Sequence, residues 1–271
     1  MNIEGRRIET LWIAGADAQA PPLVFLHEGL GSLGLWRDVP RRLVEATGAS
    51  ALVYSRYGNG FSGVLESARP VAYMHEEALE ALPALLDHFA IRRPVLVGHS
   101  DGASIALIHA AQHPVRALIL EAPHVFVEEL SLRSIAAVRE PYLQGELRRR
   151  LARHHADVDR TFFGWNDVWL SPEFRGWNIE AYAARISAPT FLLQGQTDEY
   201  GSRAQLQAIR AAAQGPVDEL LLAGCGHTPH RDRPDLVLPA IAAYVRTLTA
   251  ASASGRPLPG PALDPEGAAQ L

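Results

Sequence analysis

Short apolar runs recur along the chain, and stretches with helical spacing separate most of them. Continuous apolar runs of this kind are typical of strands that are buried on both faces of a parallel sheet. The runs that we interpret as strands lie at 8–14, 23–27, 51–54, 94–97, 117–120, 189–194 and 218–222. Helices are expected at about 35–45, 71–89, 103–112, 203–213 and 236–249. The alternation predicts an α/β fold, with a mostly parallel central sheet and helices on both of its faces.

Two parts of the chain depart from this alternation. Residues 124–186 are dense in charged and aromatic side chains, and we interpret them as a helical lid inserted between two parts of one sheet. The core would then consist of residues 1–123 and 187–249. Residues 250–271 are rich in Ala, Pro and Gly, so they lack apolar side chains to offset the entropy of ordering. We expect this tail to be disordered.

The N-terminal residues show a weaker strand pattern. Residues 8–14 alternate loosely between apolar and polar side chains, and residues 2–6 precede them closely. We expect these two segments to form an antiparallel pair.

Composition narrows the classes of partner. The chain has 271 residues, 48% of them hydrophobic, which suffices for one α/β domain with a large core. The net charge is −5 with both signs interspersed, which argues against nucleic acid and against a charged membrane surface. A small-molecule substrate is the expected partner, and the sequence leaves the oligomeric state open.

The single cysteine, Cys225, excludes an intrachain disulfide and a thiolate metal cluster within one chain. A reducing compartment fits this usage. We find no apolar run with the length of a signal peptide core or of a membrane span. The expectation is therefore a cytoplasmic protein that needs no metal and no cofactor.

The most informative motif is Gly98-His99-Ser100-Asp101-Gly102, which joins the apolar run 94–97 to a helical stretch. The pattern G-x-S-x-G alone would arise by chance in roughly one chain in ten of this composition. A buried strand before it and a buried helix after it are typical of a nucleophile elbow, in which small flanking residues let the serine project. We therefore interpret Ser100 as a nucleophile rather than as a structural turn serine.

A serine hydroxyl needs a base to take its proton, and the base needs an acid to orient it. Asp198 follows the apolar run 189–194 and is the candidate acid, with Glu199 as an alternate. An acid at this place could instead be a helix cap or a solvated turn residue. His227 follows the run 218–222 in a loop of small residues and is the candidate base.

In this order, the elbow, the acid loop and the histidine loop resemble the α/β-hydrolase superfamily of serine hydrolases. Residues 27–32 (HEGLGS) and 56–62 (RYGNGFS) also resemble loops of that superfamily, and the match spans about residues 1–249. The resemblance implies the α/β-hydrolase fold and an oxyanion hole made of backbone N–H groups. One donor would be Asp101, and the second would be Gly29 or its neighbour Leu30.

The elbow departs from the common pattern at Asp101, which places a carboxylate beside the nucleophile. A Ser-Asp-Gly elbow resembles that of valacyclovir-hydrolase-like members, in which the acid recognises a substrate ammonium. As a hypothesis, the Asp101 side chain binds substrate. The family usually has His-Gly where this chain has His27-Glu28, which leaves the oxyanion donor open by one residue.

Other candidate substrate-binding residues are His124 at the entrance of the lid, and Trp165 and Trp169 within it. Packing inside the lid is an equally good explanation for the two tryptophans. His154 and His155 are expected to be solvated or to cap helices, and His230 is expected to be exposed. Neither His154 nor His155 has other candidate ligands at a spacing typical of metal sites.

These features predict a cofactor-independent serine hydrolase that cleaves a small carboxylic ester, lactone or related acyl substrate through an acyl-enzyme. The nearest alternative is a carbon–carbon bond hydrolase that acts on a ring-cleavage product with the same three side chains. An alternative of another class is a noncatalytic receptor that binds a small molecule on the same fold.

Overall fold

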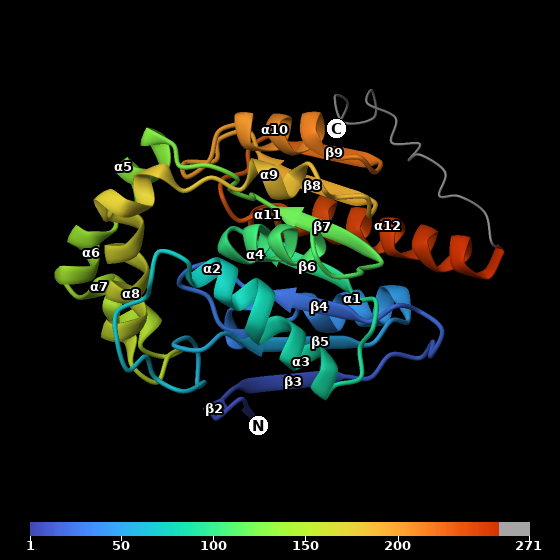
Figure 1. Cartoon of the computed structure of the whole chain (residues 1–271), viewed down its shortest axis with the longest axis horizontal. Coiled ribbons are helices and arrows are strands. Elements are labelled where there is room, and N and C mark those ends of the chain that lie inside the picture. The colour runs from blue at the N-terminus through green and yellow to red at the C-terminus, as the bar shows by residue number, and fades with distance from the viewer. Residues whose placement is uncertain (255–271) are drawn as a thin grey trace.

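The computed structural model describes residues 1–254, with side chains for residues 1–250. Its centre is a seven-stranded sheet with the order β3-β5-β4-β6-β7-β8-β9 (Figure 1). Only the edge strand β3 is antiparallel to its neighbour, and the other neighbours in the sheet are parallel. The strands are β3 (Glu9–Ile13), β4 (Leu23–Leu26), β5 (Ala51–Ser55), β6 (Val95–His99), β7 (Ala117–Glu121), β8 (Thr190–Gly195) and β9 (Val217–Leu222). The predicted fold class, an α/β-hydrolase fold, is confirmed.

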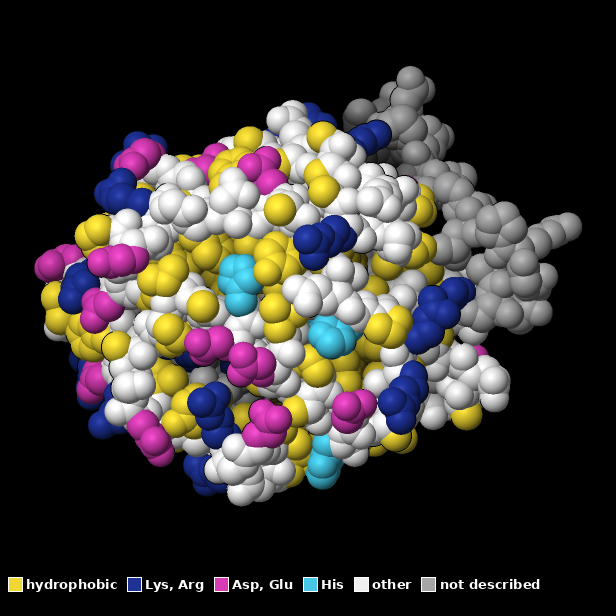
Figure 2. Space-filling view, in the orientation of Figure 1, with side chains coloured by type: hydrophobic (Ala, Val, Ile, Leu, Met, Phe, Trp, Pro, Cys, Tyr) yellow, Lys and Arg dark blue, Asp and Glu magenta, His cyan; other side chains and the backbone are white. Residues whose placement is uncertain are grey.

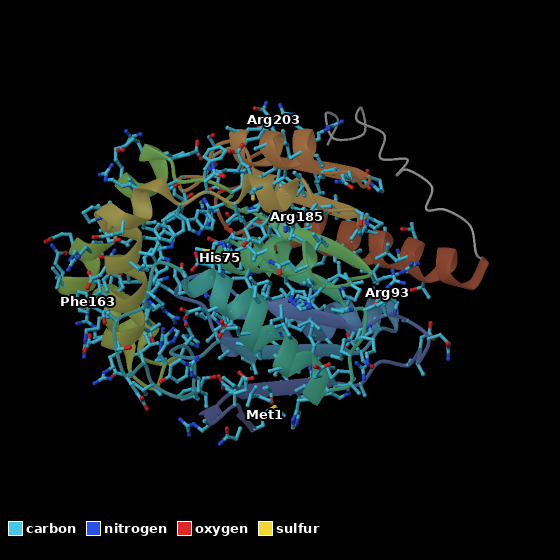
Figure 3. The ribbon with its side chains drawn as sticks, in the orientation of Figure 1. Met1, His75, Arg93, Phe163, Arg185 and Arg203 are labelled. Carbon is cyan, nitrogen blue, oxygen red and sulfur yellow. The ribbon has the colours of Figure 1, made fainter. Side chains whose placement is uncertain are left out.

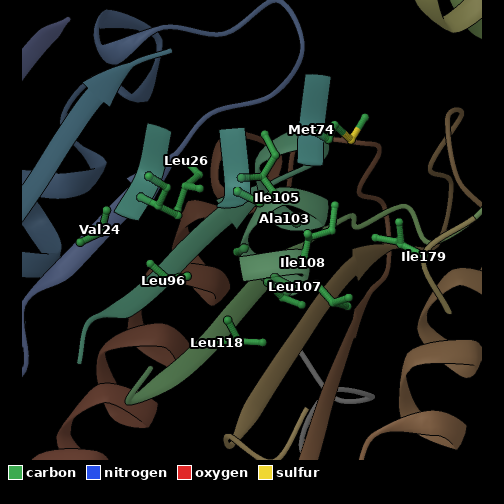
Figure 4. Packing of buried hydrophobic residues seen from close by; sticks show 14 of the residues in the cluster. Val24, Leu26, Met74, Leu96, Ala103, Ile105, Leu107, Ile108, Leu118 and Ile179 are labelled. Atoms are coloured by element: carbon green, nitrogen blue, oxygen red, sulfur yellow. The ribbon is translucent and has the colours of Figure 1, made fainter. Parts of the chain in front are cut away.

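Both faces of the sheet are buried, which explains the continuous apolar runs. Leu96 of β6 points into one core, whereas its neighbours Val95 and Val97 point into the core on the opposite face. Figure 4 shows the first of these cores, in which Leu96 and Leu118 of the sheet lie beneath Ile105 of α4. Successive side chains of a strand point to opposite faces of the sheet, so alternate residues of each strand pack into two separate cores.

Helices cover each face as the alternation predicts. The first core is covered by α2 (Tyr73–Glu76), the π-helical turn η2 (Glu77–Ala81), α3 (Leu82–His88), α4 (Asp101–Ala110), α9 (Glu180–Ala183) and α10 (Ala204–Ala212). The second is covered by the 3-10 helix η1 (Leu33–Trp36), α1 (Val39–Thr47) and α12 (Pro234–Ser254), with α11 (Pro229–Asp232) leading into the last of these.

Between β7 and β8, helices lie beyond the carboxyl ends of the strands, at the left in Figure 1. They are α5 (Glu129–Ala137), α6 (Arg139–Leu143), α7 (Glu146–Leu151), α8 (Val158–Leu170) and the 3-10 helix η3 (Pro172–Gly176). Tyr142, Val158 and Phe162 form a small core of their own, with Phe163 packed on its outer side (Figure 3). Trp169 and Phe174 belong instead to the first core of the sheet. The insertion is thus attached to the body of the protein along α8 and η3.

The N-terminal pairing differs from the prediction. β1 (Asn2–Ile3) pairs with β2 (Arg6–Arg7), and β3 pairs with β5 rather than with residues 2–6. Glu4 and Gly5 have φ angles of 48° and 81°, and two consecutive positive φ angles are typical of a two-residue hairpin turn. The turn closes the short hairpin locally and leaves the next segment free to extend the sheet.

At the other end, α12 continues through Ser254, beyond the predicted helix end at 249. The rest of the predicted disordered tail lies outside the described residues. Figure 2 shows acidic and basic side chains interspersed on the face over α2, α3 and α4. Within the described part of the chain, the helices are all too short or too polar to span a bilayer.

Candidate active site

Ser100 lies at the turn between β6 and α4, where its φ of 54° and ψ of −119° are strained for a residue other than glycine. A Cβ atom at Gly98 would lie 2.5 Å from the carbonyl oxygen of Gly102. One at Gly102 would lie 2.0 Å from the carbonyl oxygen of Leu26. Both positions therefore require glycine, and the turn has the geometry of a nucleophile elbow.

The structure brings Ser100, His227 and Asp198 together from the ends of three different strands. His227 Nε2 lies 2.9 Å from Ser100 Oγ, and its Nδ1 lies 2.8 Å from Asp198 Oδ1. A carboxylate can only accept, so Nδ1–H donates to Asp198 and the lone pair of Nε2 faces the serine hydroxyl. This tautomer is the one in which His227 can take the serine proton.

Asp198 is held in place by groups other than the histidine. Its Oδ1 accepts hydrogen bonds from the N–H groups of Tyr200 and Gly201, and its Oδ2 accepts one from Gln194 Nε2. Burial alone would raise the pKa of this carboxyl, but the hydrogen bond and charge of His227, with these donors, lower it to about 2. Asp198 is thus a fixed anion, and no contact of this kind joins Glu199 to His227 among the described residues.

The loop 27–31 lies directly beside the elbow, because a Cβ at Gly102 would also lie 2.7 Å from the carbonyl oxygen of His27. Asp101 is the first residue of α4, so its N–H is one of those that no helical carbonyl accepts. The two places where the sequence predicts oxyanion donors, the start of α4 and the 27–31 loop, therefore meet next to Ser100.

Trp165 of α8 lies against this loop. A Cβ atom at Gly29 would lie 2.1 Å from Trp165 Nε1 and 2.2 Å from its Cδ1. Such distances cannot be reached without displacing the indole or the loop. Glycine at position 29 therefore lets the lid indole approach the loop backbone.

The side chain of Asp101 is buried among groups of the chain itself. It is 1% exposed, accepts a hydrogen bond of 2.6 Å from Tyr73 Oη, and lies 3.7 Å from Arg56 Nη2. Burial raises the pKa of this carboxyl, against the opposing effects of Arg56, Tyr73 and Arg69. A cation and a phenol of the chain itself already surround the carboxylate, which favours a structural role, and its binding of substrate stays a prediction.

His124 lies between the candidate base and the lid. Its ring centroid is 5.7 Å from that of His227 and 5.3 Å from that of Trp169, and its Nδ1 has no partner among the described residues. Burial, followed by the charge of His227, lowers the pKa of His124 to about 3, so its ring is neutral. Trp169 is only 1% exposed and donates its indole N–H to Tyr73 Oη, so it forms core more than pocket wall.

Two buried histidines that were not among the predicted site residues, His99 and His230, lie close to the candidate active site. His99 Nε2 lies 2.7 Å from the backbone oxygen of His227, and its Nδ1 lies 3.5 Å from Glu28 Oε2. His230, expected to be exposed, is buried, and its Nδ1 lies 2.8 Å from Glu121 Oε2. The helical turn of α11 folds His230 back under the sheet, which no local sequence pattern indicates.

His155 also differs from its expected solvated role. It is buried, and its ring lies between the backbone of Gly60 and that of Leu30. Within residues 1–254, His, Cys, Asp and Glu side chains form no group of three or more that could hold a metal ion.

The chain is similar in sequence to known hydrolases. A model of the alpha/beta hydrolase family matches residues 23–240. A proline iminopeptidase of Lactobacillus helveticus is 24% identical over an alignment of length 267, and the match covers 82% of this chain and 89% of that protein.

Two solved structures share the fold. The proline iminopeptidase of Mycobacterium smegmatis superposes with a TM-score of 0.74 at 16% identity, over 92% of this chain and 98% of that one. The enol-lactonase of Burkholderia xenovorans LB400 superposes with a TM-score of 0.70 at 16% identity, over 90% of this chain and 98% of that one.

Proposed function

Because the chain belongs to the alpha/beta hydrolase family, we propose that it is a serine hydrolase that cleaves a small ester, lactone or related acyl substrate. The observation that carries this proposal is the hydrogen-bonded series from Ser100 through His227 to Asp198. His227 Nε2 lies within hydrogen-bonding distance of the serine hydroxyl, Asp198 is held as an anion, and Ser100 sits in a strained turn typical of a nucleophile.

In the proposed reaction, Ser100 Oγ attacks the substrate carbonyl carbon while its proton passes to His227 Nε2. The carbonyl oxygen becomes an oxyanion, which the N–H of Asp101 and that of Gly29 or Leu30 stabilise. The intermediate collapses to an acyl-enzyme, and His227 gives its proton to the leaving alcohol. Water, activated by His227 in the same way, then releases the acid and restores Ser100.

The substrate class follows from what surrounds the nucleophile. His124 is neutral and Trp165 is aromatic, so the groups that we propose to contact substrate carry no charge. The carboxylate of Asp101, which is adjacent to the nucleophile in sequence, contacts Arg56 and Tyr73. That of Glu28, in the loop beside the elbow, lies 3.5 Å from His99 Nδ1. This favours an uncharged acyl group over an aminoacyl group, although the relatives named above include proline iminopeptidases.

A substrate panel tests the proposal. The wild-type protein is expected to hydrolyse p-nitrophenyl esters or simple lactones faster than L-prolyl p-nitroanilide or a dienoate ring-cleavage product. A fluorophosphonate probe is expected to label Ser100, and Ser100→Ala is expected to lose both labelling and turnover while keeping its melting temperature. Ser67→Ala, at an exposed serine outside the series from Ser100 to Asp198, serves as the matched control.

Three results would contradict the proposal. Labelling at another residue would displace Ser100 from its role. Turnover of the dienoate alone would favour a carbon–carbon bond hydrolase. Thermal stabilisation by an ester or lactone without any turnover would favour a noncatalytic receptor.

A further inference from the structure

The carbonyl groups of the 27–31 loop are held by side chains from elsewhere in the chain. Asn59 Nδ2 donates to the carbonyl oxygens of Gly29, at 3.1 Å, and Gly31, at 3.0 Å. His155 Nε2 lies 3.0 Å from the carbonyl oxygen between them, that of Leu30. Both side chains are buried, so water does not compete for these contacts.

The hydrogen bonds of His155 fix its tautomer. The N–H of Gly60 donates to His155 Nδ1 at 2.9 Å, so Nδ1 carries a lone pair. The ring proton is therefore on Nε2, which donates to Leu30. Burial lowers the pKa of His155, which keeps the ring in this neutral form.

His155 belongs to the lid, and the lid is attached to the same turn by two more hydrogen bonds. The N–H of Ala156 donates to the carbonyl oxygen of Gly60 at 2.8 Å, and Thr161 Oγ1 donates to that of Gly58 at 2.8 Å. The segment that leads into α8 is thus fixed to the 58–60 turn, and His155 reaches from that segment to the loop beside the elbow.

Pinned carbonyls determine where the N–H groups point, because the N–H and C=O of a trans peptide are opposite. His155 holds the Leu30–Gly31 peptide by its oxygen, and the N–H of Gly31 donates to the carbonyl oxygen of Glu28 at 3.0 Å. Arg56 Nη2 also donates to that oxygen, at 2.8 Å. The carbonyl oxygen of Glu28 belongs to the same peptide as the N–H of Gly29, and the two point in opposite directions. Holding that oxygen therefore orients the N–H of Gly29, which is one candidate oxyanion donor.

Asn59 acts on the other candidate donor in the same way. It holds the oxygen of the Gly29–Leu30 peptide, and the N–H of that peptide belongs to Leu30. We propose that His155 and Asn59 are positioning residues that orient the oxyanion donors, so that attachment of the lid is required for full stabilisation of the oxyanion. The inference rests on the proposed serine hydrolase function, and it concerns residues that touch no substrate.

Two substitutions at His155 separate its hydrogen bonds. His155→Gln keeps a donor at the position of Nε2 and loses the acceptor for Gly60, whereas His155→Asn keeps that acceptor and loses the donor to Leu30. His154→Ala is the matched control, because His154 is the adjacent, half-buried histidine and neither Leu30 nor Gly60 accepts or donates a hydrogen bond with it.

The measurement is the second-order rate constant for labelling of Ser100 by a fluorophosphonate. In that reaction a Ser100 Oγ–P bond forms, the P–F bond breaks with loss of fluoride, and His227 takes the proton. Removal of a direct oxyanion donor costs about 10²- to 10³-fold, so loss of a group that orients one is expected to cost about 10- to 100-fold. We expect that decrease for His155→Asn, and rates within about threefold of wild type for His155→Gln and His154→Ala.

Steady-state kinetics with p-nitrophenyl acetate distinguish a positioning role from a purely structural one, because only the positioning role predicts a change in kcat without a change in KM. Loss of transition-state stabilisation is expected to lower kcat with little change in KM. Asn59→Ser, which shortens the donor to Gly29 and Gly31, is a second variant expected to slow labelling to a similar degree. It keeps the inference testable if His155→Asn does not fold.

Labelling of His155→Asn at the wild-type rate would overturn this inference and leave the proposed function standing. Equal decreases in His155→Asn and His155→Gln, with equal losses in melting temperature, would show a general packing role and would overturn it as well. If Ser100 of the wild-type protein were not labelled at all, the proposed function would be wrong and this inference with it.

Discussion

The two sides of the candidate active site are built in different ways. On the nucleophile side, Ser100, Asp198 and His227 each follow a strand of the sheet and contact one another directly through their side chains. On the side where we propose the oxyanion to bind, called the oxyanion side below, the loop 27–31 would contribute backbone groups, and side chains from the 56–60 turn and the lid hold that loop.

This difference shows where the rigidity of each side originates. The parallel strands fix the relative positions of the three side chains, so the nucleophile side depends on the sheet. The oxyanion side depends on buried polar contacts between segments far apart in sequence, such as His155 and Leu30. Changes in the lid should therefore disturb the oxyanion side first, and the following predictions test that distinction.

The largest effect is expected on the nucleophile side. Asp198→Asn would keep the size of the side chain but remove the negative charge that stabilises the protonated form of His227 during the reaction. Its NH2 group must also face a donor, either the N–H groups of Tyr200 and Gly201 at the place of Oδ1 or Gln194 Nε2 at the place of Oδ2. We expect kcat for a p-nitrophenyl ester to fall about 10³- to 10⁴-fold, with KM much less affected.

Glu199→Gln is the matched control for that change, because Glu199 is the neighbouring, exposed acid, and among the described residues Asp198 rather than Glu199 is the acid that hydrogen-bonds to His227. It is expected to retain wild-type kcat to within about twofold, as is usual for a surface substitution with no named structural role. A similar loss in both variants would mean that the acid loop as a whole, rather than the Asp198 carboxylate, supports the reaction.

The nucleophile side could be predicted from the sequence because each of its residues lies next to a strand that the apolar pattern reveals. Elbow glycines, small residues before His227 and an acid after β8 are local signals, and the order of the strands brings them to one edge. Gln194 and Tyr200, which fix Asp198, carry no such signal.

For the oxyanion side, the sequence predicts which loop contributes the donors, but not which side chains hold that loop. The RYGNGFS turn was recognisable as a family loop, but the role of Asn59 depends on which carbonyls face it. His155 and His154 are adjacent in the sequence, and only the path of the lid decides which of them is buried. The buried pair of Asp101 and Arg56 was missed for the same reason, since the two residues are distant in sequence and meet through the fold.

A smaller effect is expected at the contact between the lid and the oxyanion loop. Gly29→Ala would place a methyl group 2.1 Å from Trp165 Nε1, so the indole or the loop must move. A displacement of this size near the reacting atoms is expected to lower kcat/KM for a p-nitrophenyl ester about 10- to 100-fold. Gly34→Ala is the control, because its methyl group would lie 3.6 Å from His154 Nδ1, an ordinary contact.

A double substitution tests whether Trp165 causes that loss. In a Trp165→Leu background, the smaller side chain leaves room for the methyl group, so adding Gly29→Ala is expected to cost less than about threefold. An undiminished loss in that background would show that alanine disturbs the loop itself, and the proposed dependence of the oxyanion side on the lid would lose this support.

The smallest effect on activity is expected at Asp101, whose side chain is buried against Tyr73 and Arg56. Asp101→Asn keeps an acceptor for Tyr73 Oη and removes the negative charge that faces Arg56 at 3.7 Å. Because the guanidinium stays buried without its counter-charge, the free energy of unfolding is expected to fall by about 1–3 kcal/mol. Denaturant unfolding measures that loss, while the ratio of kcat/KM for valyl and isovaleryl p-nitrophenyl esters should stay unchanged. A selective loss of activity on the valyl ester would mean that the carboxylate does recognise an ammonium group. The elbow would then determine substrate specificity in addition to holding the nucleophile.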